Sequence, residues 1–151
     1  MIIKRISNYS EIVRVIFLTI AVVFSGCAVN LISKYDETTD KTVTALQKKI
    51  EGHLVGLEAV DGLPECKYEQ YKQFYSEAKV DASAIAVRAA AIPKNDITIK
   101  QTLLLTNSLE SLEKLHKIAC LSKDQISPLR AQFNSSFTAI LKLELAKRRG
   151  E

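Results

Sequence analysis

The chain has 151 residues, of which 25% are charged, and its formal net charge is +4. A balance this close to neutral does not indicate a nucleic-acid partner, which calls for a strongly basic face. Five glycines, three prolines and no tryptophan are typical of a helical protein with few turns, and the length suits one domain behind an N-terminal signal.

The N-terminal segment has the layout of a secretory signal. Lys4, Arg5 and Arg14 outweigh Glu11, and residues 15–24 carry no charge. A signal has a basic start, an apolar stretch of about 7–15 residues and small residues at the cleavage site. A membrane span needs about 20 apolar residues, which is more than this segment offers. A buried core helix is the other alternative, and the extreme end of the chain is an unusual place for one.

The apolar run closes with small residues directly before a cysteine, in the order Phe24, Ser25, Gly26 and Cys27. This ending resembles the lipobox of bacterial lipoproteins. The resemblance implies that residues 1–26 are a signal peptide and that Cys27 carries a diacylglycerol and an acylated amine, which anchor residues 27–34 as a lipidated tether. Ala28 follows the cysteine, where an aspartate would imply retention in the inner membrane. The expected location is therefore the periplasmic face of the outer membrane.

Downstream of the signal, apolar residues recur at helical spacing in four segments. The first helix is expected over residues 35–58, where Ser33 or Asp36 can cap its start. Its apolar stripe consists of Tyr35, Val43, Leu46, Ile50, Leu54 and Leu57. The second is expected over residues 65–91, with an aromatic first half and an alanine-rich second half. Pro93 ends it, because the residue before a proline avoids the α region.

The third helix is expected over residues 96–121, capped by Asn95 or Asp96. Its core-facing stripe consists of Leu105, Leu109, Leu112, His116 and Ala119. Glu113 and Lys117 are spaced as an exposed pair of opposite charges on neighbouring turns, which favours the helix by a small amount.

The fourth helix is expected to start at Ser127 as its N-cap, because Pro128 then occupies the first helical position, and to end near residue 148. Residues 122–125 also fit a capping box, which allows a short extra turn before it. Short connections favour antiparallel neighbours. The sequence therefore predicts an all-α fold, an up-down-up-down four-helix bundle over residues 35–149 with essentially no sheet.

Cys66 and Cys120 remain once Cys27 is lipidated, and each lies equally far along the sequence from Pro93. In an antiparallel helix pair connected at that proline, equal offsets place both cysteines at one level. The periplasm is oxidising, so we expect a disulfide between Cys66 and Cys120. Two buried free thiols are the alternative, and a catalytic redox pair would need a closer spacing such as C-x-x-C.

The two histidines, His53 and His116, are the first candidates for chemistry. Glu113 and His116 form half of the Glu-x-x-His pattern of carboxylate-bridged di-iron sites, but Ile50 stands where the second glutamate is needed. We therefore expect no metal and no cofactor. His116 is expected at the edge of the core with a hydrogen-bond partner, and His53 is expected to be exposed near a helix end.

Tyr68, Tyr71 and Tyr75 are expected to fill the core with their hydroxyls at its rim, and a sugar- or peptide-binding patch is the alternative. The sequence contains no nucleophile elbow, phosphate-binding glycine loop or haem attachment motif. We therefore expect no catalytic residue and do not expect an enzyme, for which an unrecognised site built from the histidines and carboxylates would be needed.

These observations favour a non-catalytic lipoprotein that is held to the membrane by the acyl chains on Cys27 and contacts an envelope protein or a cell-wall component through a helix face. The alternative is a carrier that opens around a small apolar ligand or lipid in the bundle core. Residues 35–40 and 137–142 look like pieces of small uncharacterised bacterial lipoproteins. That resemblance implies no activity and no site residue.

Overall fold

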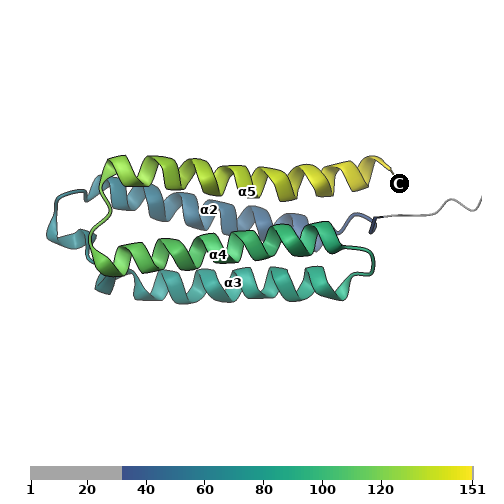
Figure 1. Cartoon of the computed structure of the whole chain (residues 1–151), viewed down its shortest axis with the longest axis horizontal. Helices are drawn as coiled ribbons and strands as arrows, with labels where there is room; N and C mark the ends of the chain where they lie inside the picture. The colour runs from purple at the N-terminus through teal and green to yellow at the C-terminus, as the bar shows by residue number, and fades with distance from the viewer. Residues whose placement is uncertain (1–31, 151) are drawn as a thin grey trace, which may run out of the picture. The chain divides into compact units, whose positions relative to one another are not determined.

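A computed structural model describes residues 32–150, which form four long α-helices (Figure 1). These helices are α2 (Glu37–Ala59), α3 (Lys72–Ala91), α4 (Asp96–Ile118) and α5 (Lys123–Arg149). Two short 3₁₀ helices, η1 (Pro64–Cys66) and η2 (Tyr68–Tyr71), connect α2 to α3, and the described residues contain no strand. The predicted signal peptide over residues 1–26 and the predicted lipidation at Cys27 lie outside the described residues.

Each helix packs against two others, so that α2 and α4 both contact α3 and α5. Successive helices run in opposite directions (Figure 1), and the predicted all-α, up-down-up-down four-helix bundle is confirmed. Each helix has one apolar face and an opposite polar face, as expected of a bundle. Within the described range, no helix combines the length and apolar character that crossing a membrane requires.

The core is built mainly from the apolar stripes that the sequence spacing predicts, but Ala119, predicted in the stripe of α4, lies beyond the end of that helix and is exposed. Its largest fully buried side chains include an aromatic residue from α3, another from α5 and a series of leucines and isoleucines from α2 and α4. In the middle of α3 the buried side chains Ala78 and Ala82 are small and allow neighbouring backbones to come close. Members of this core are Val43, Leu46, Ile50, Leu54, Leu57, Tyr75, Ala78, Ala82, Ile85, Leu105, Leu109, Leu112, Leu121, Ile126, Phe133, Phe137 and Ile140.

The predicted start of the second helix at residue 65 is wrong, because α3 begins at Lys72. Pro64 opens the 3₁₀ turn η1 instead, and Lys67 is extended with φ −68° and ψ 141°. An extended residue interrupts the helical hydrogen-bond ladder. The aromatic side chains of this segment are therefore presented by tight turns rather than by a continuous α-helix. The predicted end of the third helix at residue 121 is also too late. The helix α4 ends at Ile118, because the next residue, Ala119, is extended.

The predicted N-cap at Ser127 is also wrong. The helix α5 begins at Lys123, with Ser122 as N-cap and a capping box in which the Gln125 side chain accepts from the Ser122 backbone N–H. Pro128 consequently lies inside the helix rather than at its first position. The capping box satisfies two orphan donors at the helix start, and this outweighs the preference of proline for that place.

The bundle has two chemically different ends, which we name by their contents. The Ile32 end holds the first described residues, the α3–α4 connection and the C-terminus of α5 (Figure 1). The disulfide end holds η1, η2 and the α4–α5 connection. Each end contains a group of buried polar side chains, and these two groups are the candidate functional features.

Candidate functional site

A disulfide joins Cys66 of η1 to Cys120, just after α4, with 5.4 Å between the two Cα atoms. The predicted pairing of these two cysteines is therefore confirmed. Cys66 is buried. The bond connects the turns that precede α3 to the far end of α4, and it closes the α3–α4 hairpin at the end opposite its loop.

A chain of hydrogen bonds, which we call the histidine cluster (His53, Tyr75, His116 and the Cys66 carbonyl), runs from α2 to the disulfide. The carbonyl oxygen of Cys66 can only accept, so His116 Nε2 donates to it over 2.6 Å. In neutral His116 the Nδ1 atom then accepts from the Tyr75 hydroxyl at 2.7 Å. The Tyr75 oxygen in turn accepts from His53 Nε2 at 3.2 Å. Every donor in the chain has an acceptor, as buried polar groups require.

The prediction that His53 is exposed is wrong, since this side chain is 7% exposed. Its ring stacks on Phe74 with 3.6 Å between the ring centroids. Burial, with a smaller electrostatic contribution from the neighbouring His116, lowers the pKa of His53 from 6.5 to about 3. His116 is buried and hydrogen-bonded, close to the prediction of a core-edge histidine with a partner.

Tyr75 is fully buried in the core, whereas Tyr68 and Tyr71 are partly buried beside it. Burial raises the pKa of the Tyr75 hydroxyl, and the negative charge of Glu113 adds to the shift. The hydroxyl therefore remains protonated and acts as a relay between two histidines. The prediction that these tyrosines fill the core holds fully for Tyr75 alone.

Glu113 is buried rather than half of an exposed pair, which corrects the prediction for Glu113 and Lys117. Its carboxylate accepts from the Tyr68 hydroxyl at 2.8 Å and from Lys79 Nζ at 2.8 Å. Burial opposes its ionisation, but the hydrogen bonds from Lys79, Lys117 and Tyr68 prevail and lower the pKa of Glu113 from 4.5 to about 2. Across the described helices and turns, no three His, Cys, Asp or Glu side chains are placed to hold a metal ion.

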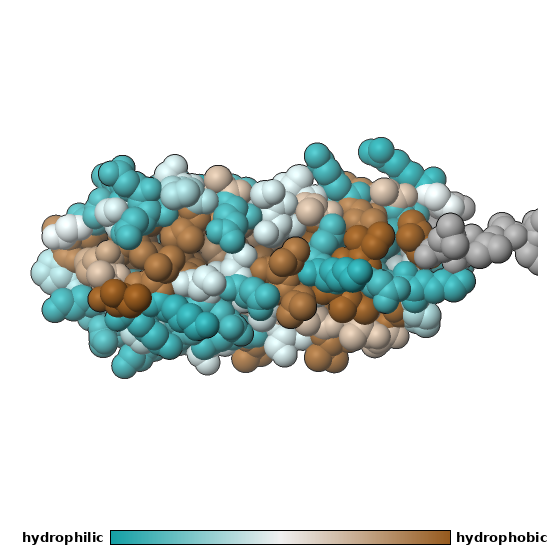
Figure 2. Space-filling view, viewed as in Figure 1, coloured by the Kyte–Doolittle hydropathy of each residue, from teal (hydrophilic) through white to brown (hydrophobic). Residues whose placement is uncertain are grey.

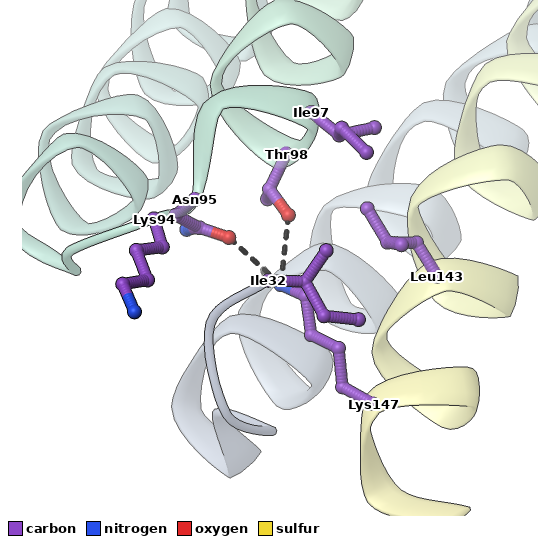
Figure 3. Close-up of a pocket in the computed structure, with 7 residues that line it drawn as sticks. All are labelled: Ile32, Lys94, Asn95, Ile97, Thr98, Leu143 and Lys147. Atoms are coloured by element: carbon purple, nitrogen blue, oxygen red, sulfur yellow. Dashed lines mark hydrogen bonds between the residues drawn. The ribbon is translucent and has the colours of Figure 1, made fainter. Parts of the chain in front are cut away.

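At the Ile32 end, the buried Lys147 of α5 is hydrogen-bonded to Asn95 and Thr98 at the start of α4 (Figure 3). Lys147 Nζ donates to Asn95 Oδ1 at 2.7 Å, to Thr98 Oγ1 at 2.9 Å and to Glu144 Oε1 at 2.6 Å. Ser33 Oγ also donates to Asn95 Oδ1, at 2.9 Å. We call Ser33, Asn95, Thr98, Glu144 and Lys147 the lysine cluster. All five are buried, and the three ammonium protons each have an acceptor.

The lysine cluster holds the first described residues against the bundle. Ser33 also donates its backbone N–H to the Lys94 carbonyl at 2.9 Å. Asp36 caps α2 through the Thr39 N–H and forms a double hydrogen bond with Arg88 of α3, both at 2.6 Å. This guanidinium holds the pKa of Asp36 well below its usual range, with the hydrogen bonds from Thr39 adding to the shift against the effect of burial.

The sequence contains a signal for the lysine cluster that simple hydrophobic spacing misses. Glu144 and Lys147 continue the inward spacing of Phe133, Phe137 and Ile140 along α5. Charged residues at core positions can be interpreted as a buried pair only when their hydrogen-bond partners are known. For Lys147, the partners Asn95 and Thr98 lie at the start of another helix, α4, so spacing along α5 does not reveal them. The same reasoning applies to His53, which follows Ile50 by three residues on the buried face of α2.

Two hollows lie near the Ile32 end. One is a cavity of about 10 Å³ beside the lysine cluster, which holds at most about one water. The other is an open groove of about 450 Å³, lined by Tyr35, Glu37, Asp40, Lys41, Thr44, Ala45, Lys48 and Arg148. Most of the side chains that line it are charged, so its chemistry differs from that of an apolar ligand cavity.

The outer face of α3 carries exposed apolar side chains at helical spacing. Val80 and Val87 are 65% and 68% exposed, and Ala84 and Ala91 lie on the same face. Apolar surface along the lower edge of Figure 2 coincides with the position of α3 in Figure 1. We call Val80, Ala84, Val87 and Ala91 the α3 stripe.

Comparison with known proteins assigns no function to these features. No protein-family model, curated protein or solved structure matches the chain.

Proposed function

We propose that the chain is a membrane-anchored lipoprotein of the bacterial cell envelope, held on the periplasmic side by acyl chains on Cys27. Its bundle is non-catalytic and binds an envelope protein or a cell-wall component. The observation that carries this proposal is the lipobox-like end of the apolar run, Phe24 to Cys27, a few residues before the bundle begins at Ile32. A lipid anchor on Cys27 would be joined to the folded bundle by only a few residues.

The cysteines support the proposed compartment. Of the three cysteines, Cys66 and Cys120 form the disulfide, so that Cys27 is the remaining one. Disulfides persist in oxidising compartments such as the periplasm and are rare in the cytosol. A free Cys27 that can be lipidated and a disulfide between the other two cysteines are both consistent with an exported protein.

The α3 stripe supports the proposed binding role. Small apolar residues on an exposed helix face allow a partner helix to approach closely, with i, i+4, i+7 spacing providing the contacts. Isolated exposed apolar residues need no explanation, but Val80 and Val87 share one face with two alanines. We therefore propose a helix of an envelope protein as the partner of this stripe.

Intact-mass analysis of the protein extracted from bacterial membranes tests the anchor. We expect the mass of residues 27–151 plus a diacylglycerol and an amide-linked acyl chain. The Cys27→Ala variant should keep the leader and lack the lipid, whereas the Cys66→Ser/Cys120→Ser variant should still be lipidated. A full-length, lipid-free mass for the unmodified chain would remove the anchor from the proposal.

Site-specific photo-crosslinking in intact cells tests the partner surface. A crosslinking side chain at position 87 should give a discrete adduct with one envelope protein, and one at position 80 should give the same adduct. Ala131, which is exposed on α5, provides the matched control position. Equal, diffuse adducts at all three positions would contradict a specific partner on α3.

The carrier alternative has less support in the described residues. Phe133 and Phe137, which such a carrier would use to line its ligand, are buried in the core. Phe74 stacks on His53, and the larger of the two hollows at the Ile32 end is a charged surface groove. A carrier of lipids would need an apolar cavity of about 300 Å³ or more within the bundle.

A further inference from the structure

Positive charge is concentrated at one end of the bundle. The Lys49–Asp81 and Gln132–Ser108 hydrogen bonds mark the middle of the helices. The half towards the Ile32 end, residues 32–48, 82–107 and 136–150, contains ten Lys or Arg and five Asp or Glu. The other half contains eight and ten. The Ile32 end therefore has an excess of positive charge.

Three of the five acidic residues at the Ile32 end are already paired with cations. Asp36 pairs with Arg88, Glu37 with Lys41, and Glu144 with Lys147. The remaining cations are exposed, and they come from the first described residues, α2, α4 and the last turns of α5. They are Lys34, Lys48, Lys100, Lys142, Arg148 and Arg149. These side chains give this end a positive electrostatic potential, which attracts an anionic partner.

Exposed apolar side chains lie among these cations. Ile32 is 40% exposed and Ile97 is 51% exposed, and both line the cavity beside Lys147 (Figure 3). Apolar surface is also visible at this end among long polar side chains (Figure 2). Cations around an apolar centre match the interface of an anionic bilayer, where headgroups bind the charges and the acyl boundary accepts the isoleucines.

The length of chain ahead of the bundle keeps this end close to a membrane. The five peptide steps from Cys27 to Ile32 span at most about 17 Å when fully extended. From Ile32 onward the chain is fixed, because Ser33 is bound to Asn95 and Lys94. Electrostatic attraction to the headgroups extends only about 8–10 Å at physiological salt, so the short connection is what keeps this end near enough to reach them.

We propose that the Ile32 end is a second membrane contact, which docks on anionic phospholipid through its exposed Lys and Arg and through Ile32 and Ile97. The proposal rests on the proposed lipid anchor and deepens it. The lipid chain determines that the protein stays at the membrane, and the docking surface determines its orientation. The bundle stands on the bilayer with its disulfide end outward and the α3 stripe accessible to a partner.

The sequence contains no tryptophan, so a single introduced one is a clean reporter. The Ile97→Trp and Ile118→Trp variants of the full chain are lipidated in cells, extracted, and reconstituted into vesicles that contain brominated phosphatidylcholine. One set of vesicles also contains one third phosphatidylglycerol. Ile118 is 82% exposed and lies at the disulfide end, so it is the matched control.

We expect flotation of both variants with both kinds of vesicle, because the acyl chains suffice for anchoring. Quenching of the probe at position 97 should be roughly twofold larger with phosphatidylglycerol and should fall at high salt. The probe at position 118 should change little. Adding Lys100→Glu, Arg148→Glu and Arg149→Glu should abolish the difference at position 97, whereas Lys67→Glu, Lys72→Glu and Lys114→Glu at the other end should preserve it.

The outcomes separate the two proposals. Flotation with equal quenching at both positions, or quenching that is indifferent to phosphatidylglycerol, overturns the docking surface and leaves the anchor in place. Absence of flotation from both vesicle types overturns the anchor and the docking surface together. Cross-links between two copies through the Ile32 end on anionic vesicles would assign this surface to self-association and overturn the lipid contact.

Discussion

A lysine ammonium is stable in a protein interior only where its protons find acceptors and a counter-charge is near. Lys147 meets both conditions, with a carboxylate, an amide oxygen and a hydroxyl as acceptors. Removing one partner of a buried pair is costly because the other charge remains buried. The pair therefore favours the one arrangement of α4 and α5 in which both charges have partners.

The Lys147→Met variant tests this interpretation. Glu144 is fully buried and would lose its counter-ion, so the free energy of unfolding should fall by about 3 kcal/mol. Urea denaturation followed by circular dichroism measures the change. The control Lys142→Met, at an exposed position of the same helix, should stay within about 0.5 kcal/mol. A double variant, Glu144→Gln/Lys147→Met, should recover part of the loss, and no recovery would contradict a charge-pair origin.

His53 predicts how stability depends on pH. Its pKa is about 3 in the folded protein and 6.5 when exposed, so the unfolded chain binds the proton more readily. The stabilisation is complete above pH 6.5 and is lost as the pH falls towards 3, at up to about 1.4 kcal/mol per pH unit. Glu113, whose pKa moves from 4.5 to about 2, contributes only at the acidic end of this range.

Urea denaturation between pH 7 and pH 5 (roughly the window in which His53 alone of these two groups titrates) measures this dependence. The His53→Gln variant should be less stable at pH 7 and should show a flatter profile over the same interval. A wild-type stability that is constant over this window would contradict the buried, neutral state of His53.

The long helices are stabilised by their own backbone hydrogen bonds, whereas the two 3₁₀ turns depend on contacts with other elements. The turns η1 and η2 lack an extended helical ladder. They are held instead by the disulfide, by the His116 bond to the Cys66 carbonyl and by the Tyr68 bond to Glu113. The disulfide end therefore depends on contacts between elements rather than on local propensity.

The Cys66→Ser/Cys120→Ser variant should lose about 4 kcal/mol of stability, because the bond closes a loop with a sequence separation of 54. Amide hydrogen exchange should accelerate first in residues 64–71. The α3–α4 connection at the other end provides the internal control and should be little affected. Exchange that accelerates no more in residues 64–71 than elsewhere in the bundle would show that the disulfide does not secure these turns.

Pro128 weakens α5 locally, since it removes one helical N–H and crowds the preceding turn. The Pro128→Ala variant should raise the free energy of unfolding by about 1–3 kcal/mol, reduced somewhat by the greater freedom of the unfolded chain. Thermal unfolding measures the gain, and Ser127→Ala, at the exposed neighbouring position, is the control. A lower melting temperature would show that the proline serves an unrecognised packing role.

The sequence predicts the helices better than their ends, for a physical reason. Apolar spacing reports which face is buried over many residues, so the core stripes of α2 and α4 follow from it directly. A helix end depends on a few competing hydrogen bonds. The capping box at Ser122 prevails over the proline at 128, and the extended Lys67 interrupts a segment whose composition favours a helix.

The polar clusters illustrate what the spacing leaves undetermined. Cys66 and Cys120 are equally far along the sequence from Pro93. This is enough to predict their pairing, because both belong to the single helical hairpin that turns at that proline. The burial of His53 depends on Phe74 and Tyr75 from another helix. The environment of Lys147 depends on Asn95 and Thr98. Such side chains are interpretable only after the helices have been placed beside one another.

At the scale of the whole molecule, the arrangement separates two surfaces. The cations and Ile97 lie at the Ile32 end, whereas the α3 stripe runs along the side of the bundle. The two proposed contacts, one with a bilayer and one with a protein, therefore use different surfaces. The lysine cluster and the histidine cluster fix the two ends of the scaffold that keeps these surfaces apart.

The common position of Ile32 and the C-terminus of α5 has a practical consequence for labelling. An affinity tag appended to the C-terminus would sit beside the first residues of the bundle, where it would crowd whatever they face. Gly62, in an exposed turn with φ 77° and no neighbouring atom within 4 Å of a Cβ there, offers an insertion point at the opposite end. A short epitope placed after Gly62 should leave the melting temperature within a few degrees, whereas the same epitope between Ser33 and Lys34 should lower it markedly.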